Sequence, residues 1–152
     1  MFTDWALASL HHLAIFTLAA ILAAELAILT MDVDAKAIQR LARIDTGYGL
    51  SATIVVIVGV ARVIWGAKGY EYYLANHIFW TKMALFLIVG LLSIRPTFRY
   101  LAWRRQLRVD AAFAPAASEV ARMRAYLWAE AAFFLAIPVA ASAMARGYGM
   151  AN

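Results

Sequence analysis

The sequence contains no cysteine among its 152 residues. This absence excludes a disulfide framework, a thiolate metal site and a cysteine nucleophile. Charged residues are also scarce, because they make up 15% of the chain, whereas a soluble domain has roughly 25%. Since 65% of the residues are hydrophobic, the composition argues against a water-soluble domain and favours an integral membrane protein.

The chain also lacks the basic leading region of a secretory signal peptide, because Asp4 is the first charged residue. The apolar stretch that follows is much longer than the roughly 7–15 residues of a signal-peptide core. We therefore expect this stretch to stay in the mature protein. No internal repeat and no water-soluble lobe is evident in the sequence.

Four apolar stretches explain the composition: Trp5 to Met31, Leu50 to Trp65, Ile78 to Ile94 and Ala125 to Ala145. Each has a length near the roughly 17–25 residues that a spanning helix needs. The sequence therefore predicts an all-α fold, a four-transmembrane-helix bundle, in a single integral-membrane domain over residues 1–152. The predicted helices cover about 5–31, 48–66, 78–108 and 118–146.

Basic residues concentrate in two of the segments that connect the apolar stretches. Ten of the fourteen Lys and Arg residues follow the first apolar stretch or lie between the third and fourth stretches: Lys36, Arg40, Arg43, Arg95, Arg99, Arg104, Arg105, Arg108, Arg122 and Arg124. Because basic loops stay in the cytoplasm, this distribution predicts a multi-pass protein of the bacterial inner membrane with both termini on the periplasmic side. The same charges predict contact with anionic membrane lipids and no role in nucleic-acid binding.

Two carboxylates lie inside the apolar stretches. Glu25 and Glu130 are each roughly 8–9 Å from the cytoplasmic end of their stretch at 1.5 Å per residue. An ionisable residue at membrane depth costs a few kcal/mol or more, so it is usually paired or functional. We expect the pair either to form a proton or ion relay or to make structural salt bridges with Arg40, Arg43 or Arg95.

A second polar layer lies nearer the periplasmic side, where the first three helices contribute His11, Arg62 and Lys82. Residues 11 and 25 share one helical face, whereas His12 is more than about 100° away from Glu25. If Glu25 faces the bundle interior, His11 faces it too. Arg62 and Lys82 are near enough to the surface that snorkelling to water is an equal alternative.

Short motifs along nearly the whole chain resemble a bacterial family of small membrane proteins, domain of unknown function 2214. They are Leu10-His11-His12-Leu13-Ala14 with Glu25, Arg40-Leu41-Ala42-Arg43-Ile44-Asp45, Tyr48-Gly49, Arg62, Gly69, Tyr72-Tyr73-Leu74, Phe79-Trp80-Thr81-Lys82, Gly90 to Thr97, and Trp128-Ala129-Glu130. The resemblance implies four helices and an inner-membrane location.

A more distant resemblance connects the chain to HemJ-type protoporphyrinogen oxidases, which are helical proteins that carry b-type haem. His11 in the first helix and Lys82 after Trp80 in the third match that family. The family has a histidine two residues before the lysine, where this chain has Trp80, and His77 is the nearest substitute. The resemblance implies haem b, with His11 as a ligand of the haem iron.

The leading functional hypothesis is therefore a haem- or porphyrin-handling redox protein, a membrane oxidoreductase. In it His11 is the axial ligand, either with His77 as a second ligand or as the single histidine, and Arg62 and Lys82 pair with the haem propionates. Glu25 and Glu130 act as a polar relay in the layer nearer the cytoplasmic side. One alternative is a proton or ion relay that uses the two glutamates without a cofactor.

Another alternative is a structural accessory subunit of a larger membrane complex. Gly59, Gly90 and the many alanines permit close helix contact. The sequence thus also predicts a homodimer or assembly into such a complex.

Overall fold

The computed structural model describes residues 2–66 and 69–150. In these residues the chain forms four long helices and one short helix. Their bounds are α1 Phe2–Leu29, α2 Ala35–Trp65, α3 Gly69–Leu74, α4 His77–Val109 and α5 Ala117–Ala145. The predicted all-α fold is confirmed.

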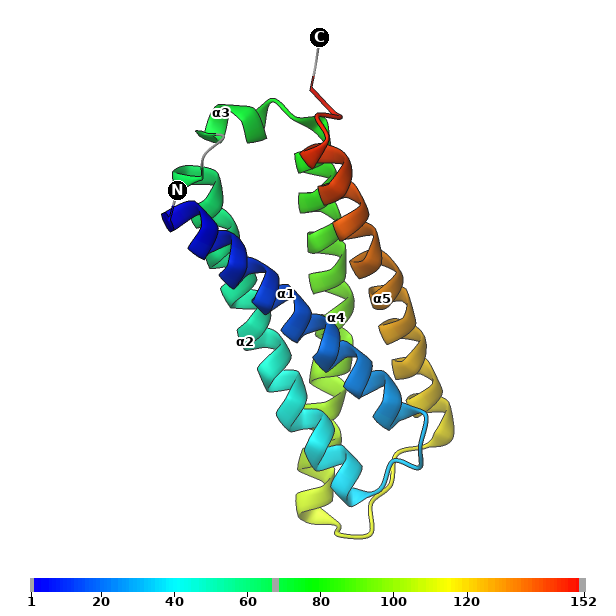
Figure 1. Ribbon diagram of the computed structural model, residues 1–152. Helices are drawn as coiled ribbons and strands as arrows, with labels where there is room; N and C mark the ends of the chain where they lie inside the picture. Colours follow the sequence, from blue (N-terminus) through cyan, green and yellow to red (C-terminus); the bar gives the residue numbers. More distant parts are fainter. Residues whose placement is uncertain (1, 67–68, 151–152) are drawn as a thin grey trace.

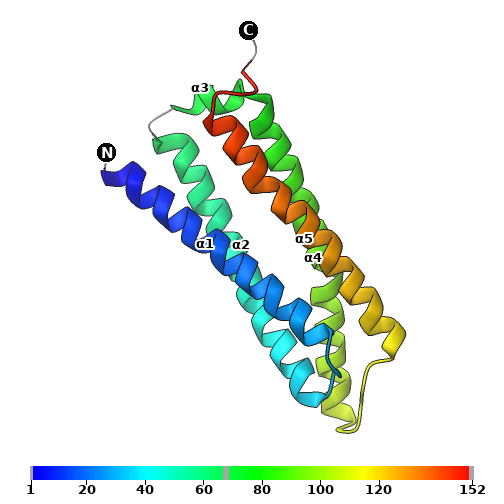
Figure 2. The same ribbon diagram turned by 45° about the vertical axis from the view of Figure 1, so that its right-hand side comes forward.

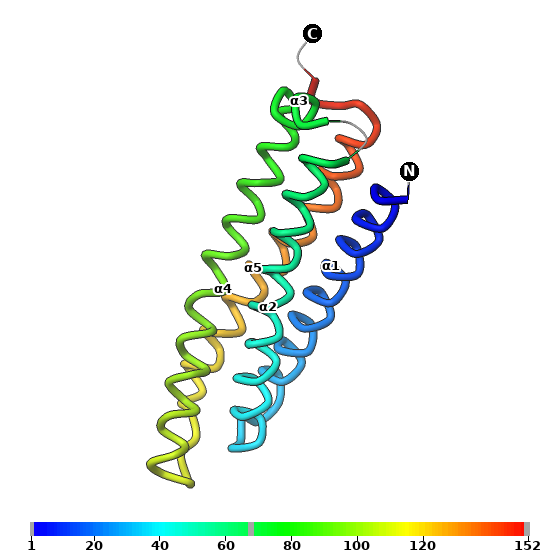
Figure 3. The backbone as a smooth tube through the Cα atoms, turned by 90° about the vertical axis from the view of Figure 1, so that its left-hand side faces the viewer, coloured from blue at the N-terminus to red at the C-terminus, as the bar shows by residue number. Residues whose placement is uncertain are grey.

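The long helices form two antiparallel hairpins, α1 with α2 and α4 with α5 (Figure 1). Contacts of α2 with α4 and of α1 with α5 join the hairpins into one bundle. Both hairpin loops lie at one end, which we call the loop end, and α3 lies at the other, the α3 end. The hairpins diverge toward the α3 end (Figures 1 and 2). The start of α1 and the end of α5 both lie at the α3 end (Figure 3).

All four long helices are long and apolar enough to span a membrane. With 28 to 33 residues each, they are about 42–50 Å long at 1.5 Å per residue. The hydrocarbon core of a bilayer is about 30 Å thick, so the helices extend beyond it. Large apolar side chains such as Phe16, Leu87 and Leu135 are more than 60% exposed, as expected of surfaces that face lipid.

The second helix begins earlier than the sequence analysis predicted. We expected a start near residue 48 after the glycines 47 and 49, but α2 begins at Ala35, where the Asp34 side chain caps it by accepting a hydrogen bond from the Ala37 amide at 2.7 Å. Glycine inside a helix costs about 1 kcal/mol relative to alanine. Burial of Ile38 and Leu41, both 0% exposed, offsets that cost.

The buried core occupies the middle and the loop end of the bundle. Its largest members are Trp103 and Tyr100 on α4, which are 0% exposed and pack with ring centroids 5.8 Å apart and ring planes tilted by 46°. The Trp103 indole donates a hydrogen bond to Glu119 on α5 at 3.1 Å. No member of this core cluster comes from residues 2–13, 56–66 or 77–88. The α3 end of the described bundle is therefore the less tightly packed end.

The segment that follows α5 is hydrogen-bonded to the start of α4. Asn76 caps α4 and donates a hydrogen bond from its side-chain amide to the Tyr148 carbonyl at 3.0 Å. The His77 amide donates to the Gly149 carbonyl at 2.9 Å. Gly149 has a φ of 85°, a conformation that favours glycine. These hydrogen bonds join the start of α4 to the segment that follows α5.

Candidate functional site

Three carboxyl groups from three helices lie together inside the bundle. Glu25 on α1, Asp45 on α2 and Glu130 on α5 are 4%, 8% and 2% exposed, respectively. Each is close enough to the other two for their charges to interact. We call these residues the acid cluster. The prediction that both glutamates face the bundle interior is confirmed.

Hydroxyl groups satisfy two of the three carboxyls. The Tyr48 hydroxyl on α2 donates a short hydrogen bond to Glu130 Oε1. The Thr97 hydroxyl on α4 donates to Asp45 Oδ1 at 2.8 Å. Oε1 of Glu25 is buried and has no hydrogen-bond partner among the described residues. The buried Tyr100 hydroxyl also lacks a hydrogen-bond partner among the described residues. It is nevertheless close enough to the same three acids to interact with their charges.

Arginine does not neutralise the acid cluster. Among the residues that the structure describes, the one ion pair within 4 Å joins Arg99 to Glu119, at 3.2 Å. Arg95 instead lies over the Tyr126 ring, 5.6 Å from its centroid. The alternative that Glu25 and Glu130 are structural salt-bridge partners of nearby arginines is therefore wrong for this structure.

Asp45 and Tyr48 are members of the site that were not predicted from the sequence. The second helix was predicted to begin near residue 48, which left Asp45 in the segment before it. With α2 starting at Ala35, Asp45, Tyr48 and Ser51 follow one another at intervals of three and are all buried. This polar stripe along an otherwise apolar helix was the available signal.

The arrangement suits protons better than a coordinated metal ion. Within residues 2–66 and 69–150, no group of three or more His, Cys, Asp or Glu side chains is placed to hold a metal. The carboxyls are near enough to repel when charged, and burial makes each charge costly. Sharing or passing protons relieves both costs, and a hydroxyl such as that of Tyr48 can take part in the same hydrogen-bonded network.

A second cluster lies toward the α3 end. The side chains of His11 on α1, Arg62 on α2 and Lys82 on α4 are partly buried and close enough to interact electrostatically. We call them the outer basic cluster. Nδ1 of His11 and Nε of Arg62 are buried without a hydrogen-bond partner in the described part of the chain. His12 is exposed, so the predicted choice of His11 as the inward-facing histidine is confirmed.

The ring of His11 packs against α2. A Cβ atom built on Gly59 would lie 3.4 Å from His11 Cε1, at ordinary contact distance, so the imidazole lies next to Gly59. His77, the proposed second haem ligand, is exposed in the first turn of α4. That position does not supply the buried second ligand that a bis-histidine site requires. A haem site here would therefore depend on His11 as its one histidine.

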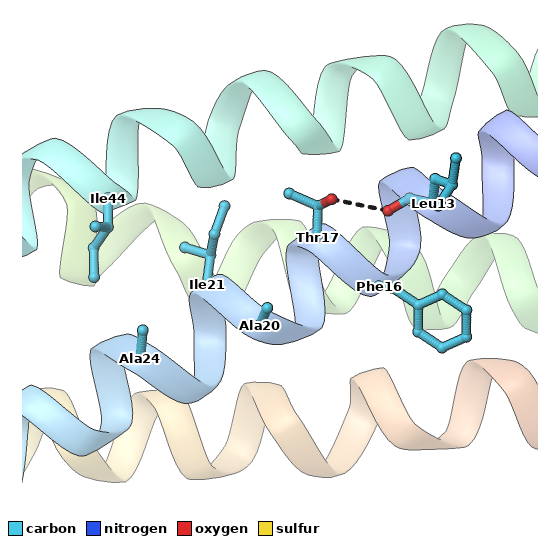
Figure 4. Close-up of a pocket in the computed structure, with 7 residues that line it drawn as sticks. All are labelled: Leu13, Phe16, Thr17, Ala20, Ile21, Ala24 and Ile44. Atoms are coloured by element: carbon cyan, nitrogen blue, oxygen red, sulfur yellow. Dashed lines mark hydrogen bonds between the residues drawn. The ribbon is translucent and has the colours of Figure 1, made fainter.

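An apolar groove lies on the outer face of the first hairpin, as Figure 4 shows. No lining residue is ionisable, and its one polar side chain, Thr17, donates a hydrogen bond to the Leu13 carbonyl at 2.9 Å. The groove is lined by Leu13, Phe16, Thr17, Ala20, Ile21, Ala24 and Ile44. It has the composition of a surface that faces acyl chains and adds no group to the candidate site.

Comparison with known proteins places the chain in a family. A family model described as "Predicted membrane protein (DUF2214)" matches residues 3–149, which include all four long helices except for Phe2. The chain belongs to this family. No curated protein and no solved structure matches it. The resemblance to the family is thus confirmed, while the more distant resemblance to HemJ-type oxidases stays a prediction.

Proposed function

We propose that this protein relays protons within the membrane through the acid cluster. The observation that carries the proposal is the burial of Glu25, Asp45 and Glu130, from three helices, at mutual electrostatic range and without an arginine or lysine ion pair in the described chain. Unpaired ionisable groups at membrane depth are expensive, and in membrane proteins they mark proton and ion pathways. A purely structural role would be served better by apolar side chains.

The polar groups define a local route. Glu130 and Tyr48 share a hydrogen bond, and Asp45 and Thr97 share another, so two donor–acceptor pairs flank the unpartnered oxygen of Glu25. Oε1 of Glu25 is a buried carboxyl oxygen free to take a proton or a water molecule. We assign Glu25 the role of the exchanging group, with Glu130 as its relay partner.

Proton flux into liposomes tests the relay. The protein is reconstituted into vesicles that contain a pH-sensitive dye, and a potassium gradient with valinomycin drives proton entry. We expect wild-type vesicles to acidify faster than protein-free vesicles. Glu25→Gln and Glu130→Gln should each slow the flux at least about tenfold, because the amide keeps the volume but cannot take up a proton.

Glu71→Gln is the matched control, since Glu71 is an exposed carboxylate on α3 outside the acid cluster. It should conduct like the wild type. Equal flux in wild-type and protein-free vesicles would refute the proposal, as would full activity of both cluster variants. Size-exclusion profiles in detergent distinguish a loss of flux from a loss of folding.

A second candidate is the haem- or porphyrin-handling redox protein. The buried, unpartnered Nδ1 of His11 beside Arg62 and Lys82 favours it, because a histidine and two cations suit haem iron and propionates. Haem would supply electron transfer, and these residues would hold it. After expression with sufficient haem, a Soret band lost in His11→Ala and kept in His12→Ala supports this candidate; a colourless wild-type protein refutes it.

We propose the bacterial inner membrane as the location, with both termini periplasmic, on the basis of the ten basic residues at the loop end. We also propose that the chain forms a homodimer or joins a larger membrane complex. Gly90 is exposed on α4, and a Cβ atom built there meets nothing within 4 Å. A neighbouring helix can approach closely at such a position.

A further inference from the structure

A pocket between α2 and α4 at the loop end is lined by three arginines and by no carboxylate. Arg43 comes from α2, and Arg104 and Arg108 come from α4. Gln39 and Thr46 add polar groups from α2, next to the buried Ala42. We propose that this arginine pocket binds the phosphate group of an anionic ligand.

The positive charge of the pocket is not cancelled by its surroundings. Residues 32–45 and 95–124 carry ten basic residues and five acidic ones, and four of the acids have partners elsewhere. Asp34 accepts from the Ala37 amide, Asp45 from Thr97, Asp110 from the Ala112 amide, and Glu119 from Trp103 while pairing with Arg99. The fifth, Asp32, is exposed in the α1–α2 loop. In the described chain, no ion pair within 4 Å involves Arg43, Arg104 or Arg108.

The chemistry of the lining suits phosphate. Guanidinium groups match phosphate oxygens in geometry and form bidentate, charge-assisted hydrogen bonds. The Thr46 hydroxyl donates to the Ala42 carbonyl at 2.9 Å, so the arginines and the Gln39 amide remain as the donors for a ligand. Because these donors come from both hairpins, a bound phosphate would connect α2 to α4.

Two sources of phosphate are compatible with the depth of the pocket. Thr46 is roughly 6 Å along α2 from Leu50, where the apolar stretch begins, and Arg108 is roughly 21 Å along α4 beyond Ile94. The polar headgroup layer adds about 5–8 Å on each side of the hydrocarbon core. The pocket therefore extends from the headgroup layer of the bilayer into water. The phosphate can belong to an anionic lipid or to a soluble compound.

The test compares two double variants with equal loss of charge. Arg43→Gln with Arg104→Gln removes two arginines that line the pocket, whereas Arg40→Gln with Arg105→Gln removes two arginines of the same helices that do not line it; all four side chains are exposed. Native mass spectrometry in detergent measures binding of phosphatidylglycerol against phosphatidylcholine. Equilibrium dialysis measures binding of inorganic phosphate and pyrophosphate.

We expect the pocket variant to lose affinity for at least one phosphate probe by about tenfold or more, because a hydrogen bond to a charged group is worth roughly 1.5–3 kcal/mol. The control variant should stay within about threefold of the wild type, since its arginines do not line the pocket. Loss for phosphatidylglycerol alone assigns the site to a lipid, and loss for phosphate or pyrophosphate assigns it to a soluble ligand. Equal losses in both variants, or no selective binding by the wild type, would overturn the proposal.

Discussion

The two buried tyrosines next to the acid cluster offer a matched pair of substitutions. Tyr48 and Tyr100 are 6% and 0% exposed. The Tyr48 hydroxyl donates a hydrogen bond to Glu130, whereas the Tyr100 hydroxyl is buried without a partner in the described chain. Replacement by phenylalanine keeps either ring in place and removes one hydroxyl. We therefore expect Tyr48→Phe to lower the free energy of unfolding and Tyr100→Phe not to lower it.

Tyr48→Phe leaves a carboxyl oxygen of Glu130 buried without its donor. If that carboxyl is protonated, the loss should be about 0.5–1.5 kcal/mol; if it is charged, the loss should be roughly 1.5–3 kcal/mol. Tyr100→Phe removes a polar group whose burial is not compensated. It should leave the stability unchanged or raise it by up to about 1–3 kcal/mol.

Reversible unfolding in mixed micelles with increasing dodecyl sulfate, followed by circular dichroism, measures both values. The size of the Tyr48→Phe effect then reports the charge state of Glu130. Adding Glu130→Gln to Tyr48→Phe closes a double-mutant cycle, and the coupling energy isolates the hydrogen bond. Destabilisation of similar size in both tyrosine variants would show that ring packing, and not the hydroxyl partner, determines the effect.

The remaining predictions concern the membrane topology and the replacement of two glycines by alanine. Reporter fusions after Ala112 should be active in the cytoplasm and fusions after Gly69 in the periplasm, because the loop end carries the basic residues; the reverse pattern would invert the orientation. Gly59→Ala should be tolerated in a thermal unfolding assay, since its Cβ would lie 3.4 Å from the His11 ring. Gly149→Ala should lower the melting temperature clearly, because φ is 85° and its Cβ would lie 2.7 Å from Asn76 Oδ1; equal melting temperatures would contradict this.

Much of the fold follows from the sequence alone. Four apolar stretches of spanning length require four helices, because a backbone in hydrocarbon has to satisfy its own hydrogen bonds. The inward orientation of Glu25, Glu130 and His11 also followed from the sequence, since a carboxylate facing lipid is too costly and helical phase links residue 11 to residue 25. These predictions rest on local periodicity and on solvation, and both are properties of a single helix.

The tertiary structure decided which polar groups meet. Local glycine content predicted a break near residue 48, but burial of Ile38 and Leu41 against neighbouring helices extends α2 back to Ala35. That extension brings Asp45 and Tyr48 to the two glutamates. It also places Arg43 opposite Arg104 of α4 in the arginine pocket. Contacts between helices depend on their rotation and relative depth, which no single segment encodes, so only packing of the whole bundle could define these two sites.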